Sequence, residues 1–430
     1  MDEPYLLTGE KVLSWSKEAV EALSTKTGDN YDKYIIFKKL YQTLTEAKNK
    51  INAVQEKWNE HRNFNENVQD QSFELVVAKN SVKKYQGMED WGDWNTAKKI
   101  TNPHELIHIP SKNLNNSIAY YIPVSRSYFK MVEMIHEFKL FENWKDKNMV
   151  IACLAEGPGG FIEAIVKNRM NNYDKIYGIT LRGNNKSVPN WRRMQYALGK
   201  LNKDDELKPN VDLTHGDLYQ DEDIRRFINR VKTSSALITA DGGFDYTTSF
   251  NYQEQVSYRL IFSEILTAFH LQAQGGTFIC KIFDIFSVLS MKMIYLVYCF
   301  YDKVYFYKPK TSRPANSEKY LVAIGFKGVQ PIWLGKLRDI QNKWIKNDSS
   351  TIDIEELKLP NDFITSIYKF NDKFIKFQID NIEQTLSLID NPPTKNMYQK
   401  MLLQQVNNAL EWCEKYDESI NYKSKYRTSY

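Results

Sequence analysis

The sequence predicts an α/β domain built on a doubly wound, mainly parallel sheet, with helical regions on both sides. Two observations predict this fold class. Between about residues 117 and 330, short apolar runs of strand length alternate with longer amphipathic segments of helical period. Near the start of this stretch, the apolar run 149–154 leads into a glycine turn and then into apolar residues at helical spacing. Such alternation is typical of parallel sheets that carry helices on both faces.

Each element of this domain follows from the spacing of its apolar residues and from the turn residues around it. Strands are expected where short apolar runs stand between turn residues, and helices where apolar residues recur every three or four positions. The expected strands are 149–154, 176–181, 211–213, 236–240, 276–281, 304–307 and 320–326. The expected helices include one that starts near residue 125, and others over 253–271 and 288–299.

The flanking segments have a helical pattern instead. We therefore divide the chain into a helical N-terminal region (1–105), the α/β domain (106–330) and a helical C-terminal region (331–430). Apolar residues at three- and four-residue steps predict the flanking helices. These are 15–23 and 34–58 before the domain, and 333–344, 360–388 and 397–412 after it.

The bulk composition limits the classes of partner. The net charge of +5 is small for 430 residues, so a nucleic-acid site should be a local basic patch. The four cysteines form no C-x-x-C pair, which favours a reducing, intracellular location. We expect the cytoplasm rather than the nucleus. The sequence has neither the pattern of a signal peptide nor an apolar run long enough to span a bilayer, so we expect no membrane partner.

One motif with a metal pattern is rejected. His104-Glu-Leu-Ile-His108 matches H-E-x-x-H, in which two histidines one helical turn apart bind zinc. Pro103 and Pro110 bracket the motif and leave too little room for a sustained helix. We expect a short segment that leads to a strand, and no metal site.

The glycine turn Gly157-Pro-Gly-Gly160 marks a candidate ligand site. Glycines are needed where the backbone takes positive φ or lies close to a ligand, and a helix N-terminus just beyond offers free N–H groups. The pattern is neither G-x-G-x-x-G nor a P-loop, which disfavours a dinucleotide or a nucleoside triphosphate. An ordinary strand-to-helix turn remains the alternative for these glycines alone.

Charged residues at the ends of buried strands form a second candidate site. Asp241 and Lys281 each end an expected strand, Glu318 precedes the last strand, and Lys130 starts a helix upstream. Charges in such positions need partners. Because the carboxyl ends of parallel strands share one edge, Asp241 and Lys281 should lie beside the glycine turn. A structural salt-bridge network is the alternative.

Together these motifs resemble the FtsJ-like RNA 2′-O-methyltransferases. Gly157-Pro-Gly-Gly-Phe161 is similar to the family's S-adenosylmethionine (SAM) loop. The four charged residues match the family's Lys-Asp-Lys-Glu tetrad in order and context. The segments Asp241–Phe244, Gly275–Lys281 and Thr311–Glu318 are especially similar to the eukaryotic and viral enzymes that methylate the first nucleotides of capped mRNA. The resemblance covers about residues 120 to 330.

The resemblance implies a Rossmann-like SAM-dependent core that transfers a methyl group to a ribose 2′-hydroxyl next to the 5′ cap. Lys281 matches the family's general base. A free lysine has a pKa near ~10.4, so this one must be perturbed to act near neutrality. Burial and Lys130 would lower its pKa, whereas Asp241 and Glu318 would raise it. The sequence leaves this balance open.

The resemblance also implies binding residues. Glu156 would substitute for the acid that many relatives carry where this chain has Cys153. Asp217 matches the acid that meets the adenine amino group, and Asp241 lies where the sulfonium would sit. The expected cofactor set is Glu156, Gly157, Gly159, Gly160, Phe161, Asp217 and Asp241, and the expected RNA set is Arg126, Lys308, Lys310, Ser312, Arg313 and Asn316. A solvated charged rim is the alternative for the basic residues.

The expected partner is RNA, with 5′-capped mRNA favoured, and the flanking helical regions are candidates to contact other capping proteins. Trp91, Trp94 and Tyr120-Tyr121 are aromatic candidates for stacking on a flat cationic cap, although core packing explains each one singly. One alternative function is an rRNA or tRNA 2′-O-methyltransferase. Another is a catalytically silent RNA-binding capping subunit, against which the complete tetrad argues.

Overall fold

The computed structural model describes residues 3–13, 16–28, 31–68, 93–110, 114–183, 188–201, 208–232, 234–244, 250–346 and 351–426. The chain divides into two compact units. Unit 1 consists of residues 1–38, 123–312 and 317–372, and unit 2 consists of residues 39–122, 313–316 and 373–430. Trp91 lies outside the described residues. The division of the sequence into three consecutive regions stays a prediction.

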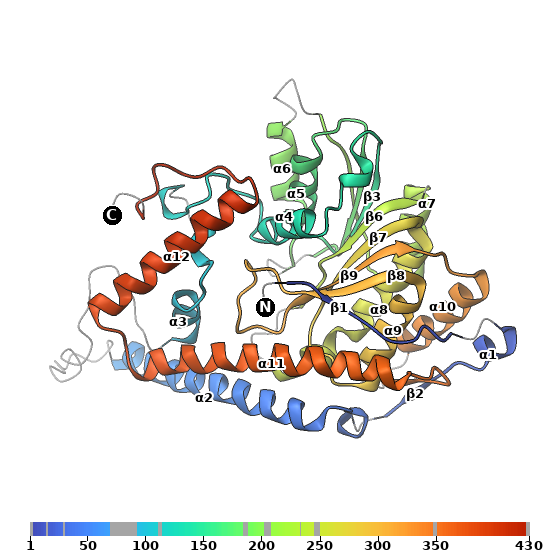
Figure 1. Ribbon diagram of the computed structural model, residues 1–430, viewed down its shortest axis with the longest axis horizontal. Coiled ribbons are helices and arrows are strands. Elements are labelled where there is room, and N and C mark those ends of the chain that lie inside the picture. Colours follow the sequence, from blue (N-terminus) through green and yellow to red (C-terminus); the bar gives the residue numbers. More distant parts are fainter. Residues whose placement is uncertain are drawn as a thin grey trace. The chain divides into compact units, whose positions relative to one another are not determined.

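Unit 1 is built on an eight-stranded sheet of order β1-β8-β9-β7-β6-β3-β4-β5 (Figure 1). Its strands are β1 (Tyr5–Leu6), β3 (Val150–Leu154), β4 (Lys175–Thr180), β5 (Asn210–His215), β6 (Ser235–Ala240), β7 (Gln272–Ile282), β8 (Tyr301–Tyr307) and β9 (Lys319–Phe326). The five strands from β7 to β5 pair in parallel, whereas β9, β8 and β1 pair antiparallel. The predicted fold class is confirmed, and all seven predicted strands are present.

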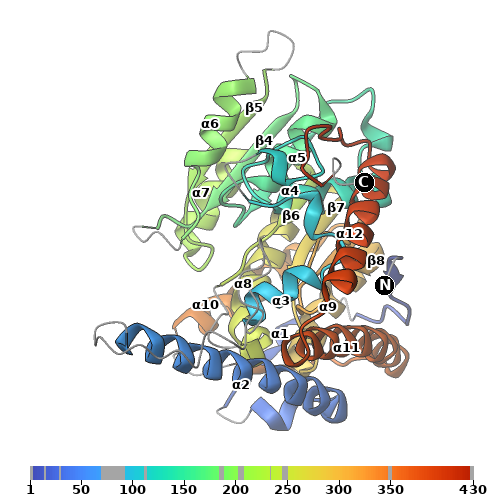
Figure 2. The same cartoon turned by 90° about the vertical axis from the view of Figure 1, so that its left-hand side faces the viewer.

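Helices cover both faces of this sheet. They are α4 (Ser127–Glu137), α5 (Gly160–Arg169), α6 (Arg192–Leu201), α7 (Asp221–Val231), α8 (Gln253–Leu271), α9 (Val288–Phe300) and α10 (Pro331–Lys346). The first three pack together on one face, and α7, α8 and α10 pack together on the other (Figures 1 and 2). The central strands β3 and β6 are therefore buried on both faces, which explains why they read as nearly continuous apolar runs.

The strand order reverses between β3 and β6. From β3 the chain runs outward through β4 and β5, and then returns to place β6 on the other side of β3. The loops that leave the carboxyl ends of β3 and β6 therefore diverge, and such a point is where open α/β sheets bind ligands. The two loops start side by side, since the Asp241 N–H donates to the Leu154 carbonyl at 3.3 Å.

Three short strands were not predicted. β1 adds two residues to the exposed edge of β8, and β2 (Ser24–Thr27) forms an antiparallel ribbon with β10 (Thr351–Glu355). Their partners are distant in sequence, so the local pattern carries little signal for them. The ribbon is fixed to α9 by the buried Lys292, whose Nζ lies 2.7 Å from Asp353 Oδ1 and donates to the Ile354 carbonyl.

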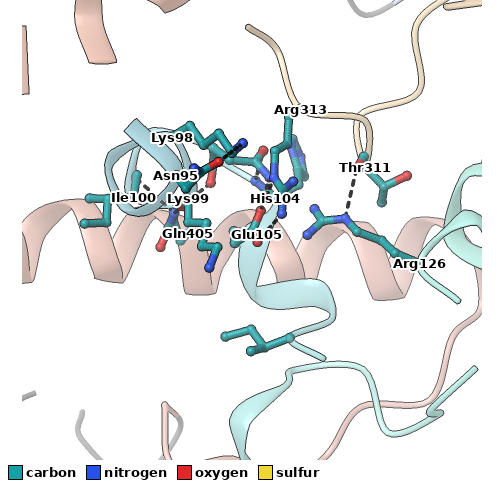
Figure 3. A network of polar contacts seen from close by, with 12 residues as sticks. Asn95, Lys98, Lys99, Ile100, His104, Glu105, Arg126, Thr311, Arg313 and Gln405 are labelled. Atoms are coloured by element: carbon teal, nitrogen blue, oxygen red, sulfur yellow. Dashed lines mark hydrogen bonds and ion pairs between the residues drawn. The ribbon is translucent and has the colours of Figure 1, made fainter. Parts of the chain in front are cut away.

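Unit 2 is mainly helical. It contains α2 from residue 39 (Lys38–Val68), α3 (Trp94–Ile100), α12 (Lys395–Lys415) and the part of α11 (Asn361–Asp390) from residue 373 onward. α12 buries Val406, Ala409 and Cys413 at three- and four-residue spacing. Its Gln405 side-chain amide donates to the carbonyls of Lys99 and Ile100, which satisfies the C-terminal end of α3 (Figure 3).

The rejected zinc motif also lies in unit 2. Glu105–Ile107 forms one 3-10 turn, so His104 and His108 do not face each other from an α-helix. A bridge between Ala119 and Ile420 follows. The predicted short segment is therefore present, but in the described residues it leads to this isolated bridge and not to the predicted strand. Across the described residues, no helix is both long and apolar enough to cross a membrane.

Candidate active site

Four charged side chains meet at the carboxyl edge of the unit 1 sheet. Lys281 Nζ lies 3.2 Å from Asp241 Oδ1 and donates to the Asp241 carbonyl at 2.9 Å. Lys130 Nζ lies 2.7 Å from Glu318 Oε1. All four side chains are between 12% and 14% exposed, so they are nearly dry but still reachable. The structure brings together the residues of the expected tetrad, and their catalytic role stays a prediction.

The antiparallel strand β9 is what brings Glu318 to the other charges. β9 pairs with β7 so that Lys281 faces Tyr320, and Glu318 stands just before the first residue of β9. The Tyr320 hydroxyl also donates to Asp241 Oδ1 at 2.9 Å. Lys130 comes from α4, which packs on α5. Three strand ends and one helix therefore fix the cluster.

The carboxylates decide the charge of Lys281. Burial lowers the pKa of Lys281, but the negative charges of Asp241 and Glu318 outweigh burial and raise it above its ordinary value. Burial likewise raises the pKa of Glu318, but Lys130 and Lys281 outweigh it and lower the pKa. In this state the cluster consists of two ammonium groups and two carboxylates. This is the balance that the sequence left open.

Two further buried acids surround Asp241. Burial, and then the charge of Asp241, raises the pKa of Glu156, whose Oε1 accepts a hydrogen bond from the Thr239 hydroxyl at 2.7 Å. Burial raises the pKa of Glu264 on α8 to about 8, and its Oε2 accepts from the Cys280 thiol at 3.5 Å. Burial therefore favours the neutral form of both acids, and Glu264 is mostly neutral at pH 7. Glu264 was not among the residues expected from the sequence, in which its signal is a charged residue inside the largely apolar stretch 260–269 of α8.

The three glycines of the turn are explained by the protein's own packing. Gly159 has φ +109°, and a Cβ there would lie 2.9 Å from the Met194 side chain. A Cβ on Gly157 would lie 2.7 Å from Thr180 Oγ1, and one on Gly160 would collide with the hydroxyls of Ser125 and Ser127. The turn thus packs directly against the start of α4. Contact between these glycines and a cofactor stays a prediction.

The remaining expected cofactor residues lie at neighbouring strand ends. Glu156, Gly157 and Phe161 follow β3, and Asp217 follows β5. Phe161 is fully buried, with its ring 5.7 Å from that of Tyr320. Asp217 is half-buried and accepts from the Tyr219 N–H at 2.9 Å. At the end of β4, Leu181 is 46% exposed although apolar. The carboxyl edge of the sheet therefore carries the exposed Leu181 side chain between the carboxylates of Asp241 and Asp217.

Several expected RNA contacts instead stabilise the segment that carries Glu318. Lys308 is buried, which lowers its pKa, and its Nζ donates to the Glu318 carbonyl at 2.7 Å. The Ser312 hydroxyl donates to Glu318 Oε1 at 2.7 Å. Arg126 Nε donates to the Thr311 carbonyl at 3.3 Å (Figure 3). Their contact with RNA stays a prediction.

Arg313 is paired within unit 2. Its guanidinium donates to the buried Glu105 carboxylate at 3.1 and 3.3 Å (Figure 3). The Asn102 side chain donates to the same carboxylate at 2.6 Å. Glu105, the acid of the rejected zinc motif, thus has a structural role. Burial, and then Arg313, lowers the pKa of Lys98 to about 8.

The other candidates differ in exposure. In the segment 308–318, Lys310 is half-buried and Asn316 is exposed. Among the aromatic candidates, Trp94 is buried in unit 2, Tyr121 is half-buried, and Tyr120 is 67% exposed. Of the described aromatic candidates, Tyr120 therefore offers the most open ring.

The packing of the turn predicts the effect of a small side chain. Gly159→Ala should lower the free energy of unfolding by about 1–3 kcal/mol, because φ is positive and Met194 occupies the space. Gly199→Ala is the matched control, since Gly199 lies in α6 with no atom within 4 Å of its Cβ position. The control should leave stability unchanged or raise it by up to about 1 kcal/mol. Urea unfolding measures both, and equal effects would contradict this account of Gly159.

Comparison with known proteins agrees with this geometry. The model of the family described as FtsJ-like methyltransferase matches residues 123–326. Cap-specific mRNA (nucleoside-2′-O-)-methyltransferase 1 of Xenopus laevis is 31% identical over 274 residues, which are 59% of this chain and 30% of that protein. The Homo sapiens protein of the same name is 29% identical over 330 residues, which are 70% of this chain and 36% of that protein.

A shorter relative has the same name in Trypanosoma cruzi. It is 28% identical over 285 residues, which are 62% of this chain and 76% of that protein. The chain spans about a third of the length of the two animal relatives. The matched family segment contains β3 to β9 and all four residues of the charged cluster. Over residues 123–326, the chain therefore matches the FtsJ-like methyltransferase family.

Proposed function

We propose that this chain transfers a methyl group from SAM to a ribose 2′-hydroxyl of mRNA next to the 5′ cap. One observation carries the proposal. The Lys281–Asp241 and Lys130–Glu318 ion pairs lie together beside the point where the strand order reverses. The printed names of the relatives specify both the cap and the 2′-oxygen. The match to the family model and these names support the reaction class.

The strand ends of unit 1 fit SAM. When bound, SAM supplies an electrophilic methyl group on a sulfonium cation. Asp241 offers a negative charge for that cation, and Asp217 offers an acceptor for an amino group at the far end of the ligand. Leu181, exposed between them, offers an apolar face for an adenine. We propose that these three side chains hold the cofactor, with the loop at Glu156–Gly160 below it.

Lys281 is the proposed general base. The neutral amine is needed to accept the 2′-hydroxyl proton, yet Asp241 and Glu318 raise the pKa of Lys281 in the unliganded cluster. A cation beside Asp241 would offset part of the negative charge that holds the proton on Lys281. Lys281 would then lose its proton only when the cofactor site is filled. Lys130 keeps Glu318 in place, and alignment and electrostatics supply the remaining catalysis.

Removing the amine tests the base. Lys281→Met should lower the rate of methyl transfer by about 10²-fold or more, because no other group replaces the base, while SAM affinity changes little. Lys292→Met is the control, since Lys292 is also a buried, ion-paired lysine of unit 1 but binds β10. It should keep its transfer rate. Radiolabel transfer and calorimetry measure the two effects, and substantial transfer by Lys281→Met would remove this lysine from the mechanism.

The raised pKa of Lys281 also predicts a pH dependence. Below that pKa, the neutral fraction of the amine rises about tenfold for each pH unit, so single-turnover rates should rise with pH from about pH 6 upward. Because its pKa is raised, Lys281 is protonated at neutral pH and becomes a base only as the pH rises. The transfer rate should therefore increase with pH. Rates that stay flat across this range, with chemistry rate-limiting, would show that deprotonation of this lysine does not control transfer.

The preference for a cap is tested by comparing capped and uncapped RNA as substrates. Short capped RNA should be methylated on the ribose next to the cap, and faster than the same RNA without a cap. Nuclease digestion with mass spectrometry locates the methyl group. Equal rates with an internal methyl would favour the rRNA or tRNA alternative and leave the tetrad mechanism intact. Binding of SAM and RNA without any transfer would favour the silent capping subunit.

Two further expectations remain proposals. We propose that the helices of unit 2 can contact another protein of the capping machinery, for which their position outside the family segment is the support. We also propose an intracellular location. The support is that all four cysteines are free and buried, as expected in a reducing compartment.

A further inference from the structure

Helix α4 presents three polar side chains to the segment that carries Glu318. Arg126, Lys130 and Glu133 are spaced by four and three residues, so they lie along one face of the helix. Arg126 donates to the Thr311 carbonyl, and Lys130 pairs with Glu318. Glu133, the third member, was not among the residues expected from the sequence.

The Glu133 carboxylate is fully buried and accepts four hydrogen bonds from one short stretch of chain. Its Oε1 accepts from the Thr311 N–H at 2.8 Å and from the Thr311 hydroxyl at 2.6 Å. Its Oε2 accepts from the Lys310 N–H at 2.6 Å and from the Tyr307 hydroxyl at 3.1 Å. Charge-assisted bonds to two successive backbone amides fix the backbone more firmly than side-chain contacts alone.

Residues 308–318 form neither helix nor strand, so no regular backbone hydrogen bonding fixes their conformation. Its conformation therefore depends on side-chain bonds such as those of Glu133. The same stretch orients Glu318, because Ser312 donates to the Glu318 carboxylate and Lys308 donates to its carbonyl. The bonds that hold Thr311 against α4 therefore also affect the distance between Glu318 and Lys130, which lies on the same helix.

We propose that Glu133 is a positioning residue for methyl transfer, which holds Thr311 against α4 and so sets the geometry of Glu318 with Lys130. The inference rests on the proposed function. Glu133 does not touch the reacting atoms and acts through Glu318. Reacting groups lose rate steeply when displaced, and a misplacement of about 1 Å can cost about 10²-fold.

The charge state of the side chain matters to this role. A carboxylate has two oxygens that only accept, and both are used by donors from Lys310 and Thr311. In Glu133→Gln the amide offers one accepting oxygen and one NH₂ group. One of the two backbone N–H groups then faces a donor and loses its partner inside the protein. The side chain keeps its size, so packing in the core of unit 1 is preserved.

The experiment compares Glu133→Gln with a matched loss elsewhere in unit 1. Asp174 is also a buried carboxylate that binds a backbone amide, the Met149 N–H at 2.6 Å, and it pairs with Arg169. It precedes β4, at the amino end of the sheet. In the full chain, kcat on capped RNA, KM, SAM affinity and Tm are measured for Glu133→Gln and Asp174→Asn.

We expect Glu133→Gln to lower kcat by about tenfold or more, with SAM affinity within about threefold of the wild type. Asp174→Asn should lower Tm without lowering kcat beyond about twofold. Thr311→Val, which removes only one hydroxyl bond, should lower kcat by a few-fold. Wild-type kcat in both Glu133→Gln and Thr311→Val would overturn the proposal, as would equal losses of kcat in Glu133→Gln and Asp174→Asn.

Hydrogen exchange separates this inference from the proposed function. Amide exchange in the segment 308–318 should speed up in Glu133→Gln and stay at the wild-type rate in Asp174→Asn. Unchanged exchange in Glu133→Gln would overturn the positioning role even in a fully active enzyme. If the wild type methylates no RNA while exchange responds as expected, the proposed function fails, and Glu133 is established only as an anchor of the segment.

Discussion

The mutual neutralisation of two lysines and two carboxylates is the constraint on which the rest of unit 1 depends. Charges that are this dry are costly, and removing one partner leaves another buried and uncompensated. The carboxyl ends of β6 and β7, the start of β9 and one face of α4 must therefore arrive together. The same arrangement raises the pKa of Lys281 and so favours its protonated form. The ion pairs that stabilise the cluster thus also oppose the deprotonation that the proposed role of Lys281 requires.

Around this cluster the protein buries two other acids. Glu156 and Glu264 are buried beside Asp241, and burial raises the pKa of both. Had both been ionised, the extra negative charge would hold the proton on Lys281 more firmly still. Burial disfavours the ionised form of both acids, which leaves the charge of Asp241 as the main local attraction for a cation. Burial of Glu156 and Glu264 therefore limits the negative charge of these three acids to that of Asp241.

The sequence predicts the sheet well because its strands are apolar runs between turn residues, and the predicted helix over 253–271 is the observed α8. The rule that parallel strands share a carboxyl edge also anticipates the meeting of Asp241 and Lys281. It could not anticipate β1, whose partner is about three hundred residues away, nor Glu133, whose donors come from another part of the chain. Gly160 is informative in another way, because its motif suggests a ligand whereas its contacts are with α4.

The position of β9 has a consequence for synthesis of the chain. β9 follows β8 in the sequence but inserts between β7 and β8 in the sheet. A ribosome therefore releases Lys130, Asp241 and Lys281 before the strand that brings Glu318, and the growing chain carries an excess cation at this edge. Glu318 arrives with the last strand of the sheet, and only then do the two carboxylates at this edge balance the two lysines.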